Sequence, residues 1–414
     1  MPRIASAAHA VSQPHFGSVI VHICYLCDEY PPGAHGGIGA YTQTMARTIV
    51  QSGHDATVVG FYQTPEVTVS EDRGVRVIRL PHSPLPWTGL LVHSWRLRRA
   101  LKKLDQSAKI DVLEGPELSL ALLPRRMSMP KIIRMNGGHH FFAVTLGKKP
   151  RPWRSWLERR SMGRADAMCA VSRFAAETTR DLLDLGSRDI PVLPNPVDVS
   201  QFVCSQQVPE EGCIVFVGTL CQKKGLHELV RAFPAILEAI PSARLVLAGR
   251  DSIDPVTGGS YAAFLRQALG HLQDRVEFLG HVDRESLPRV LARASIAVFP
   301  SHMETQGIVI VEAMAAGKPV VISQTGPGPE VVDDGVSGLL CDPYDPGSIA
   351  EKAILLLRDF ELRARMGAAA RARAEAVFSN DVLVARTLAY YRQCVRDFRS
   401  ALSHIPDSHT ADVK

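Results

Sequence analysis

Short runs of apolar, mostly β-branched residues alternate with helix-length segments from one end of the chain to the other. A strand buried on both faces of a parallel sheet shows a continuous apolar run, whereas a half-exposed strand alternates apolar and polar residues. The pattern therefore predicts an α/β protein whose parallel sheets are covered by helices on both faces. The expected strands are 18–26, 55–62, 75–81, 111–115, 131–135, 167–172 and 190–195 in the first half, and 213–218, 244–249, 275–280, 296–300, 319–323 and 338–342 in the second.

A stretch without periodic apolar residues divides the chain near its middle. Residues 194–212 hold three prolines among polar residues, which is typical of a linker. A chain of 414 residues suits two domains of roughly 150–200 residues each. We therefore expect one Rossmann-like domain over 18–199 and a second over 210–378. The pattern of residues 381–403 predicts a final helix. Its apolar stripe at Val382, Ala385, Leu388 and Ala389 should pack against another part of the protein.

The stretch SHMETQGIVIVEAMAAGKPVV, residues 301–321, is almost entirely small or apolar, yet it carries Glu304 and Glu312. Burying an ionised carboxylate without partners is costly, so each must be exposed, paired or bound to a ligand. Gly317 and Pro319 punctuate the segment, which predicts a loop with Glu304 and a helix from which Glu312 projects roughly two turns along. Two structural salt bridges are the alternative interpretation.

Two further loops are expected where open α/β sheets bind ligands, beyond the carboxyl ends of the strands. The first has Gly36, Gly37 and Gly39 before a helix, where backbone N–H groups could meet phosphate oxygens or simply form a tight turn. The second has Lys223 and Lys224 at a helix start, and a lysine there suits a diphosphate. The G-x-G-x-x-G spacing is absent, which disfavours a dinucleotide-dependent oxidoreductase.

Composition narrows the class of protein. An apolar fraction of 46% and a charged fraction of 21% are those of a globular chain, neither disordered nor a coiled coil. The eight cysteines are scattered, which indicates reduced thiols in the cytoplasm rather than a disulfide framework. We interpret Cys24 and Cys27 as structural, because residues three apart on a strand point to opposite faces. No apolar run reaches the length of a membrane span.

The net charge of +5 is concentrated in two segments of the first half. Residues 95–103, WRLRRALKK, hold five basic residues, and residues 151–164, RPWRSWLERRSMGR, hold five arginines and two tryptophans. Arginine interleaved with tryptophan suits the anionic interface of a membrane. The alternative is two solvated helix faces with the tryptophans in the core. We expect no nucleic-acid partner.

These motifs together resemble the retaining glycosyltransferases of the GT-B class, in the large group 1 and family 4 type that includes bacterial mannosyl- and glucosyltransferases. The resemblance extends from YPPGAHGGIGAYTQTM through FVGTLCQKKGLHELVRAF to ETQGIVIVEAMAAGKPVV and PEVVDDGVSGLL. Its most specific element is the pair of glutamates separated by seven residues. The resemblance implies two facing Rossmann-like domains, with the donor mainly on the second, the acceptor on the first, and a C-terminal helix that crosses back to the first.

The resemblance also implies a reaction, the transfer of a hexose from a nucleotide-diphosphate sugar to a hydroxyl of a glycan or lipid-linked acceptor in cell-surface glycan synthesis. By matching motif positions, Glu304 would contact the donor sugar near the reaction centre, Glu312 would hold the ribose hydroxyls, and Lys224 would neutralise the diphosphate. The other implied donor-binding residues are Gly36, Gly37, Gly39, Thr219, Lys223, Arg250, Val282, Gln306, Gly307 and Ile308.

Two positions depart from the pattern of the relatives. Thr219 stands where they often carry arginine, so Lys223 or Arg250 could supply the missing cation. Asn136 stands where they often carry histidine, so His139 or its neighbour His140 could take that polar role, and His139 is the catalytic candidate of the two. These departures leave room for a catalytically idle sugar-nucleotide-binding or assembly subunit. An epimerase of the same fold is a further alternative.

The sequence contains no D-x-D triplet, the carboxylate pair with which metal-dependent transferases often hold a divalent ion. We therefore expect a reaction that needs neither metal nor cofactor. Retention by front-face attack of the acceptor hydroxyl is implied by the resemblance alone. The expected location is the cytoplasm, including the inner face of the cytoplasmic membrane.

Overall fold

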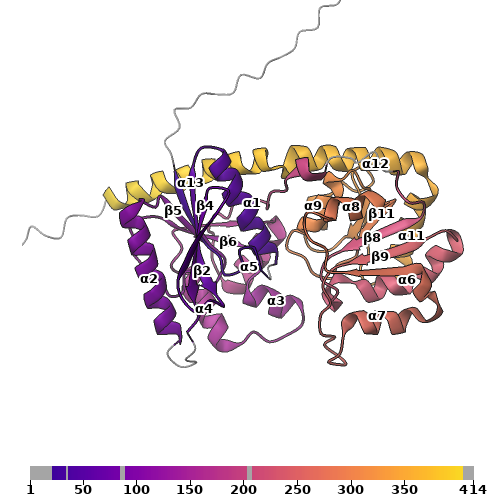
Figure 1. Cartoon of the computed structure of the whole chain (residues 1–414), viewed down its shortest axis with the longest axis horizontal. Coiled ribbons are helices and arrows are strands. Elements are labelled where there is room, and N and C mark those ends of the chain that lie inside the picture. The colour runs from indigo at the N-terminus through magenta and orange to yellow at the C-terminus, as the bar shows by residue number, and fades with distance from the viewer. Residues whose placement is uncertain (1–20, 34–35, 84–88, 203–207, 404–414) are drawn as a thin grey trace, which may run out of the picture.

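The computed structural model describes residues 21–33, 36–83, 89–202 and 208–403, so residues 18–20 of the first expected strand lie outside it. Two α/β domains lie side by side, and a run of helices at the C-terminal end extends across both (Figure 1). Among the described residues, no helix is long and apolar enough to cross a membrane. The expected architecture of two Rossmann-like domains is confirmed.

The first sheet, as far as the structure describes it, has seven strands, and only β3 runs antiparallel to its neighbour. Its spatial order is β3 (Thr68–Asp72), β4 (Val75–Pro81), β2 (Asp55–Tyr62), β1 (His22–Leu26), β5 (Val112–Gly115), β6 (Lys131–Met135) and β7 (Ala167–Ala170). The helices of this domain are α1 (Gly37–Gln51), α2 (Gly89–Ser107), α3 (His139–Thr145), α4 (Pro152–Met162) and α5 (Arg173–Leu183).

The second sheet has six parallel strands within the described part of the chain. Their order is β10 (Val276–Gly280), β9 (Arg244–Ala248), β8 (Cys213–Val217), β11 (Ile296–Phe299), β12 (Val320–Ser323) and β13 (Leu339–Cys341). The helices are α6 (Leu226–Ala239), α7 (Tyr261–Leu269), α8 (Leu287–Arg293), α9 (Ile308–Ala315), α10 (Gly328–Val331), α11 (Pro346–Arg358) and α12 (Phe360–Arg373), followed by α13 (Asn380–Ser403).

The apolar strands form the cores because side chains from both faces of each sheet are covered by helices. In the first domain, α1 and α13 cover one face, whereas α2, α4 and α5 cover the other. Cys24 packs in one of these two cores and Cys27 in the other, and both are free thiols. Burial raises the pKa of Cys24 and raises that of Cys27 to about 11. The structural interpretation of this pair is therefore confirmed.

Two expectations about elements are wrong, and one strand was missed. Residues 190–195 form no strand and make only an isolated bridge between Ala170 and Val192, because the prolines of this segment cannot donate ladder hydrogen bonds. Strand β3 was not expected, because it is a largely exposed edge strand without an apolar run. In α13, Leu383, Val384 and Thr387 are buried while Ala385 and Ala389 are exposed, so the predicted stripe is rotated around the helix.

Helix α13 crosses back onto the first domain, as expected (Figure 1). Its Tyr391 hydroxyl donates to Glu114 Oε2 at 2.5 Å, and Glu114 also accepts from the Arg134 guanidinium at 3.0 Å and from the Tyr41 hydroxyl at 2.7 Å. Burying a charge is tolerated when it is paired and hydrogen-bonded in this way. Glu114, on β5, thus links α13 to the first sheet by a hydrogen bond.

Candidate active site between the two domains

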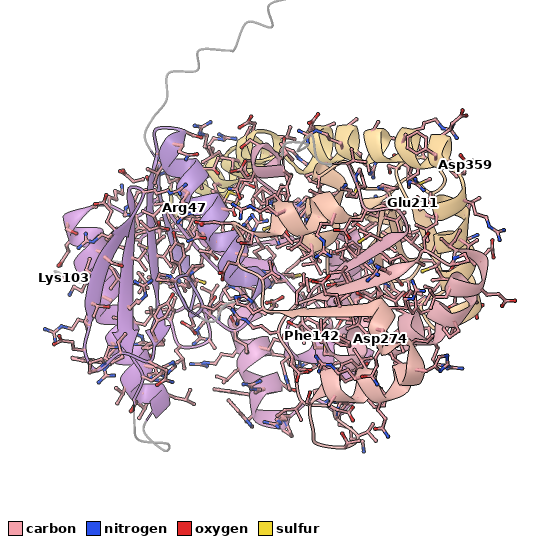
Figure 2. All side chains as sticks on the ribbon, turned by 45° about the vertical axis from the view of Figure 1, so that its right-hand side comes forward. Arg47, Lys103, Phe142, Glu211, Asp274 and Asp359 are labelled. Atoms are coloured by element: carbon pink, nitrogen blue, oxygen red, sulfur yellow. The ribbon has the colours of Figure 1, made fainter. Side chains whose placement is uncertain are left out.

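Loops from both domains meet at the carboxyl ends of the two sheets. Gly137, after β6, lies so close to the second domain that a Cβ on it would come within 2.6 Å of Thr305 Cγ2. The Lys223 ammonium lies 4.9 Å from the centroid of the Phe142 ring, and Figure 2 shows Phe142 where the two domains meet. A Cβ on Gly37 would touch Ile308 at 3.9 Å. The predicted loops of both halves therefore line one cleft.

Glu304 and Lys224 form an ion pair in this cleft. Lys224 ends a short 3-10 turn, and Gly225 follows it with a φ of 65°, packed so closely that a Cβ would lie 1.8 Å from the Pro300 carbonyl oxygen. Only glycine fits there without distortion, and this contact fixes the lysine loop against the end of β11. The two side chains are only 15% and 18% exposed, so their charges face a partly dry cleft.

Glu312 lies on α9 and is buried, with its carboxylate 3.7 Å from the Arg284 guanidinium. Burial raises the pKa of Glu312 to about 7, and the charge of Arg284 opposes this rise only in part. The expected helix over this segment is confirmed, including a left-handed Gly317 just after its end. Glu304 and Glu312 are thus both in ion pairs, as the alternative interpretation expected, but a carboxylate in one ion pair still has hydrogen-bonding capacity for a ligand.

The remaining candidate residues for binding the donor differ in their exposure and in the groups that they contact. Thr219 is exposed after β8, and the Arg250 guanidinium donates to the His281 ring at 3.3 Å. Val282 is half-buried and packs on the second core. The Gln306 side chain is committed to the linker, because its Oε1 accepts from the Asn195 amide at 2.6 Å and its Nε2 donates to the Asn195 carbonyl at 3.0 Å. Therefore only the backbone of Gln306 is available to bind a donor substrate.

The glycine loop of the first domain faces the start of α9 across the cleft. Gly36 caps α1, and Gly307 caps α9 with a φ of 81°. The Gly39 amide donates to Glu29 Oε1 at 2.8 Å, so a carboxylate of the protein already occupies part of this helix start. A diphosphate would therefore have to meet the other amides of the loop.

The two adjacent histidines have different surroundings. His140 is buried, and its Nδ1 lies 2.5 Å from Glu158 Oε2. His139 lines a cavity, and its Nε2 accepts from the Arg151 amide at 2.8 Å. Burial and neighbouring cations lower the pKa of His139, although Glu158 acts in the opposite direction. The Asn136 side chain donates to the Arg134 carbonyl at 3.0 Å and lines a smaller, separate cavity.

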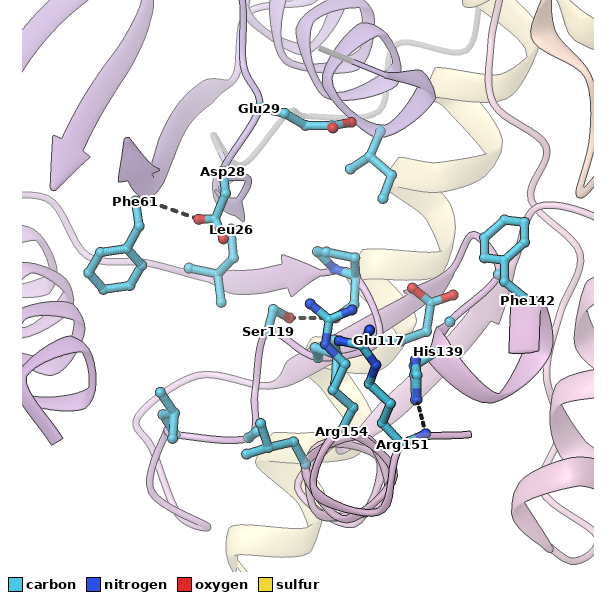
Figure 3. Close-up of a pocket in the computed structure, with 18 of the residues that line it drawn as sticks. Leu26, Asp28, Glu29, Phe61, Glu117, Ser119, His139, Phe142, Arg151 and Arg154 are labelled. Atoms are coloured by element: carbon cyan, nitrogen blue, oxygen red, sulfur yellow. Dashed lines mark hydrogen bonds between the residues drawn. The ribbon is translucent and has the colours of Figure 1, made fainter. Parts of the chain in front are cut away.

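The cavity that His139 lines has a volume of about 890 Å³ and is lined entirely by the first domain (Figure 3). Glu117, at its back, is buried and accepts from the Asn136 amide at 2.5 Å. Burial, together with the charge of Glu158, raises the pKa of Glu117 to about 7 against the lowering effect of backbone hydrogen bonds. Sequence reasoning missed Glu117 and Glu158. The signals were a Glu two residues beyond an expected strand in DVLEGPE, and a Glu inside a basic helix.

Another residue that sequence reasoning missed joins the domains. Glu330, on α10, accepts from the amides of Arg173 and Phe174 at 2.7 and 2.8 Å, and these amides begin α5 of the first domain. A carboxylate stabilises the electropositive start of a helix. This contact holds the two walls of the cleft together.

The three tryptophans of the described basic segments are exposed. Trp95, Trp153 and Trp156 are 58%, 54% and 58% exposed. Each lies beneath an arginine guanidinium at 5.1 to 5.4 Å. The alternative in which these tryptophans belong to the core is therefore wrong.

The chain matches two family models, one described as glycosyltransferase family 4 over residues 35–201 and one as glycosyl transferases group 1 over residues 204–373. A glycogen synthase of Mycobacterium tuberculosis is 29% identical, over 91% of this chain and 96% of that protein. A D-inositol 3-phosphate glycosyltransferase of Acidothermus cellulolyticus is 30% identical, over 96% of this chain and 94% of that protein.

Solved structures show the same fold. A sucrose-phosphate synthase from Thermosynechococcus elongatus superposes with a TM-score of 0.73 and 23% identity, over 90% of this chain and 98% of that one. The Anabaena protein HepE, in complex with UDP and glucose, gives a TM-score of 0.67 and 20% identity, over 89% and 100% of the two chains. The chain therefore belongs to the group 1 and family 4 glycosyltransferases and has the GT-B fold.

Proposed function

We propose that this glycosyltransferase moves a hexose from a nucleotide-diphosphate sugar to a hydroxyl acceptor with retention of the anomeric configuration. The observation that carries the proposal is the ion pair of Glu304 and Lys224 at the point where the two domains meet. HepE, which shares the fold, was solved with UDP and glucose, and this supports a nucleotide sugar as donor. The relatives named as glycogen synthase and D-inositol 3-phosphate glycosyltransferase support a sugar transfer.

The proposed roles follow from where charge develops. The acceptor oxygen bonds to the anomeric carbon as the bond from that carbon to the diphosphate oxygen breaks. The electron pair and the acceptor proton both leave with the nucleoside diphosphate. Lys224 and the amides that begin α9 stabilise the negative charge on the diphosphate. Glu304 positions the donor sugar, and Glu312 accepts hydrogen bonds from the ribose hydroxyls.

We propose that this reaction needs no divalent metal ion. Instead, Lys224 neutralises the negative charge of the diphosphate. Lys223 or Arg250 replaces the arginine that is missing at Thr219. The backbone amides of Gln306, Gly307 and Ile308 donate hydrogen bonds to the diphosphate oxygens. Gly36, Gly37 and Gly39 would complete the cradle from the first domain, and Val282 would lie beside the base. The absence of a D-x-D triplet supports this assignment.

The acceptor is proposed to bind the first domain, as a lipid-linked or polysaccharide precursor in cell-surface glycan synthesis. His139 is a candidate contact to the reacting sugar, because it lines the cavity beside Phe142. The exposed tryptophans and arginines of 95–103 and 151–164 favour docking on an anionic membrane surface. This location corresponds to the cytoplasmic face of the membrane.

A panel of nucleotide sugars tests the proposal, with release of UDP, GDP or ADP as the readout. We expect one donor to be turned over with or without a chelator. Loss of turnover in the chelator would contradict metal independence. Tight binding of a nucleotide sugar without any release, in the presence of acceptor extracts, would favour the idle binding subunit instead.

A further inference from the structure

The Arg284 side chain lies beside the carboxyl to which the donor ribose is proposed to bind. Arg284 follows β10, two residues beyond Val282, whereas Glu312 is on α9. Its Nη2 lies 3.7 Å from Glu312 Oε1, and the two side chains are 26% and 6% exposed. Two segments that are distant in the sequence thus bring one cation to one largely buried acid.

The distance between these two groups is too long for a hydrogen bond. An arginine that donates to a carboxylate does so at about 2.7–2.9 Å. Arg284 therefore acts on Glu312 through its charge and does not occupy the lone pairs of the carboxylate. An ionised carboxylate can accept both hydroxyls of a ribose, one on each oxygen. A protonated carboxyl loses part of this capacity, because one of its oxygens becomes a donor.

The surroundings of Glu312 work against its ionisation. The helix that carries it, IVIVEAMA, is otherwise apolar. Burial raises the pKa of Glu312 to about 7, and the charge of Arg284 opposes this rise. When a pKa lies near the working pH, the ionised fraction changes steeply with any neighbouring charge.

The other charged groups around α9 have partners of their own. Helix α12 packs against α9, and its Arg371 pairs with Glu375 at 2.8 Å and donates to the carbonyl that ends α9 at 2.7 Å. Lys318, beyond that end, donates to two backbone carbonyls at 2.9 and 3.0 Å. Before the start of α9, Glu304 is paired with Lys224. The cation whose charge acts on the Glu312 carboxyl is therefore Arg284.

The Arg284 guanidinium is not bound to the backbone as a structural arginine would be. Arg373, for comparison, donates to the carbonyls of Val331 and Glu330 at 2.7 and 3.0 Å. The Nε of Arg284 is buried and makes no hydrogen bond within the part of the chain that the structure describes. A buried donor without a partner is costly, so packing alone does not explain this side chain.

We propose that Arg284 is a positioning residue for the nucleotide, which keeps the buried Glu312 ionised so that both of its carboxylate oxygens accept the donor ribose. The inference rests on the proposed function, since that function assigns the ribose to Glu312. Arg284 acts through Glu312 and not by a contact of its own with the ribose. Its effect should therefore disappear at a pH where Glu312 is ionised without help.

The preference of the full chain for a ribonucleoside diphosphate over its 2′-deoxy form tests this inference. UDP and GDP would each be titrated beside the 2′-deoxy form between pH 6 and 9. Titration of the diphosphate itself cancels in the ratio of the two affinities. For the wild type, this ratio should rise as pH rises through about 7 and then level off, because Glu312 ionises.

The variant Arg284→Met should shift this rise upward by about one pH unit, as the loss of a neighbouring opposite charge predicts. Its preference for ribose should then be about threefold lower than that of the wild type at pH 7 and should recover at pH 9. Arg284→Lys keeps the charge and should stay close to the wild-type curve. The matched control is Arg289→Met, which removes an exposed arginine of α8 and should leave the curve unchanged.

Three results would show that the inference is wrong. In the first, Arg284→Met keeps the wild-type curve. In the second, its preference stays low at pH 9, which would mean that Arg284 binds the ribose directly. In the third, its preference rises at every pH, which would mean that Arg284 competes with the ribose for Glu312.

The variant Glu312→Gln separates this inference from the proposed function. Its preference should be low at every pH, and adding Arg284→Met to it should cause no further change. If Glu312→Gln keeps the full preference for ribose, the proposed role of Glu312 fails. If Glu312→Gln loses the preference while Arg284→Met behaves as the wild type, only the role of Arg284 fails.

Discussion

The two walls of the cleft each contain one carboxyl whose pKa burial raises to about 7, but the groups around the two carboxyls differ. On the donor side, Glu312 is buried with Arg284 as its charged neighbour. On the acceptor side, Glu117 is buried near a second acid, Glu158, and already accepts the Asn136 amide. The donor-side carboxyl therefore retains capacity for a ligand, whereas the acceptor-side carboxyl, carried by the segment after β5, also supports the loop after β6.

The cations of the two walls differ in the opposite sense. Lys224 on the donor wall is paired with Glu304, whereas Arg151 and Arg154 on the acceptor wall have no acidic partner among the described residues. A cation paired with an acid is held in place before the ligand arrives, and such preorganisation favours stabilisation of a developing charge. Arg151 and Arg154 are exposed, so solvent screens their charges and they lack this preorganisation.

The largest expected effect comes from Lys224→Ala. Removing one preorganised charge partner of a leaving group lowers kcat by about 10²–10³-fold. Steady-state release of the nucleoside diphosphate measures this loss. The comparison variant is Lys223→Ala, whose ammonium packs on Phe142 rather than on Glu304; as a secondary cation for the diphosphate, Lys223 should contribute less to kcat. Equal losses in the two variants would remove the distinction between these neighbouring lysines.

The contact between the walls is tested by Gly137→Ala. A Cβ at this position would lie 2.6 Å from Thr305 Cγ2 and 3.0 Å from the Phe142 ring. Displacing the reacting groups by about 1 Å can lower transfer by roughly 10²-fold. Gly147→Ala is the control, since Gly147 also has a positive φ of 66° but meets nothing within 4 Å.

Both glycine variants carry backbone strain on the order of 1–3 kcal/mol and should melt at lower temperatures, with Gly137→Ala lower than Gly147→Ala because of its additional steric clash. Only Gly137→Ala should lose transfer, while its affinity for UDP or GDP stays near that of the wild type. Full transfer by Gly137→Ala would show that the close approach of the walls is dispensable.

A smaller effect is expected in the pH dependence of stability. Glu312 and Glu117 keep their protons in the folded protein up to about pH 7, whereas in the unfolded chain they release them near 4.5. The unfolded state then binds fewer protons, so the free energy of unfolding falls as pH rises from 4.5 to 7. The expected fall is on the order of 1–3 kcal/mol per carboxyl.

Denaturant titrations at several pH values measure this fall in the wild type, in Glu312→Gln and in Glu117→Gln. Each variant should remove the contribution of its own carboxyl to the pH dependence of the free energy of unfolding. Saturating nucleotide should reduce the contribution of Glu312 to this pH dependence, because ribose hydroxyls stabilise its ionised form. The contribution of Glu117 should not change. A dependence that rises with pH in this window would contradict the buried, protonated state of both groups.

The donor wall was largely predictable from sequence, because its residues occur in short contiguous motifs. Glu304 and Glu312 stand out as charges in an apolar run, and the strand, loop and helix around them follow from Gly317 and Pro319. The acceptor cavity was not predictable, because its lining comes from segments between Leu26 and Leu157 that only the fold brings together.

Some missed features had a signal in the sequence. Strand β3 leads into β4 through Arg73 and Gly74, both with positive φ, and such a two-residue turn indicates a hairpin even where the strand itself is polar. Glu114 and Arg134 each interrupt an apolar strand, and parallel neighbours with opposite charges suggest a buried pair. The one-residue rotation of α13 had no such signal, because its alanines fit either face.

The most direct test of the division of roles on the donor wall compares Glu304→Gln with Glu312→Gln in two measurements, affinity for the nucleoside diphosphate and rate of transfer. We expect Glu304→Gln to abolish transfer while nucleotide affinity stays close to that of the wild type. Glu312→Gln should weaken nucleotide binding by about tenfold, as the loss of a charge-assisted hydrogen bond predicts. If the two variants lose affinity and transfer to the same extent, the assignment of separate roles to the two glutamates is wrong.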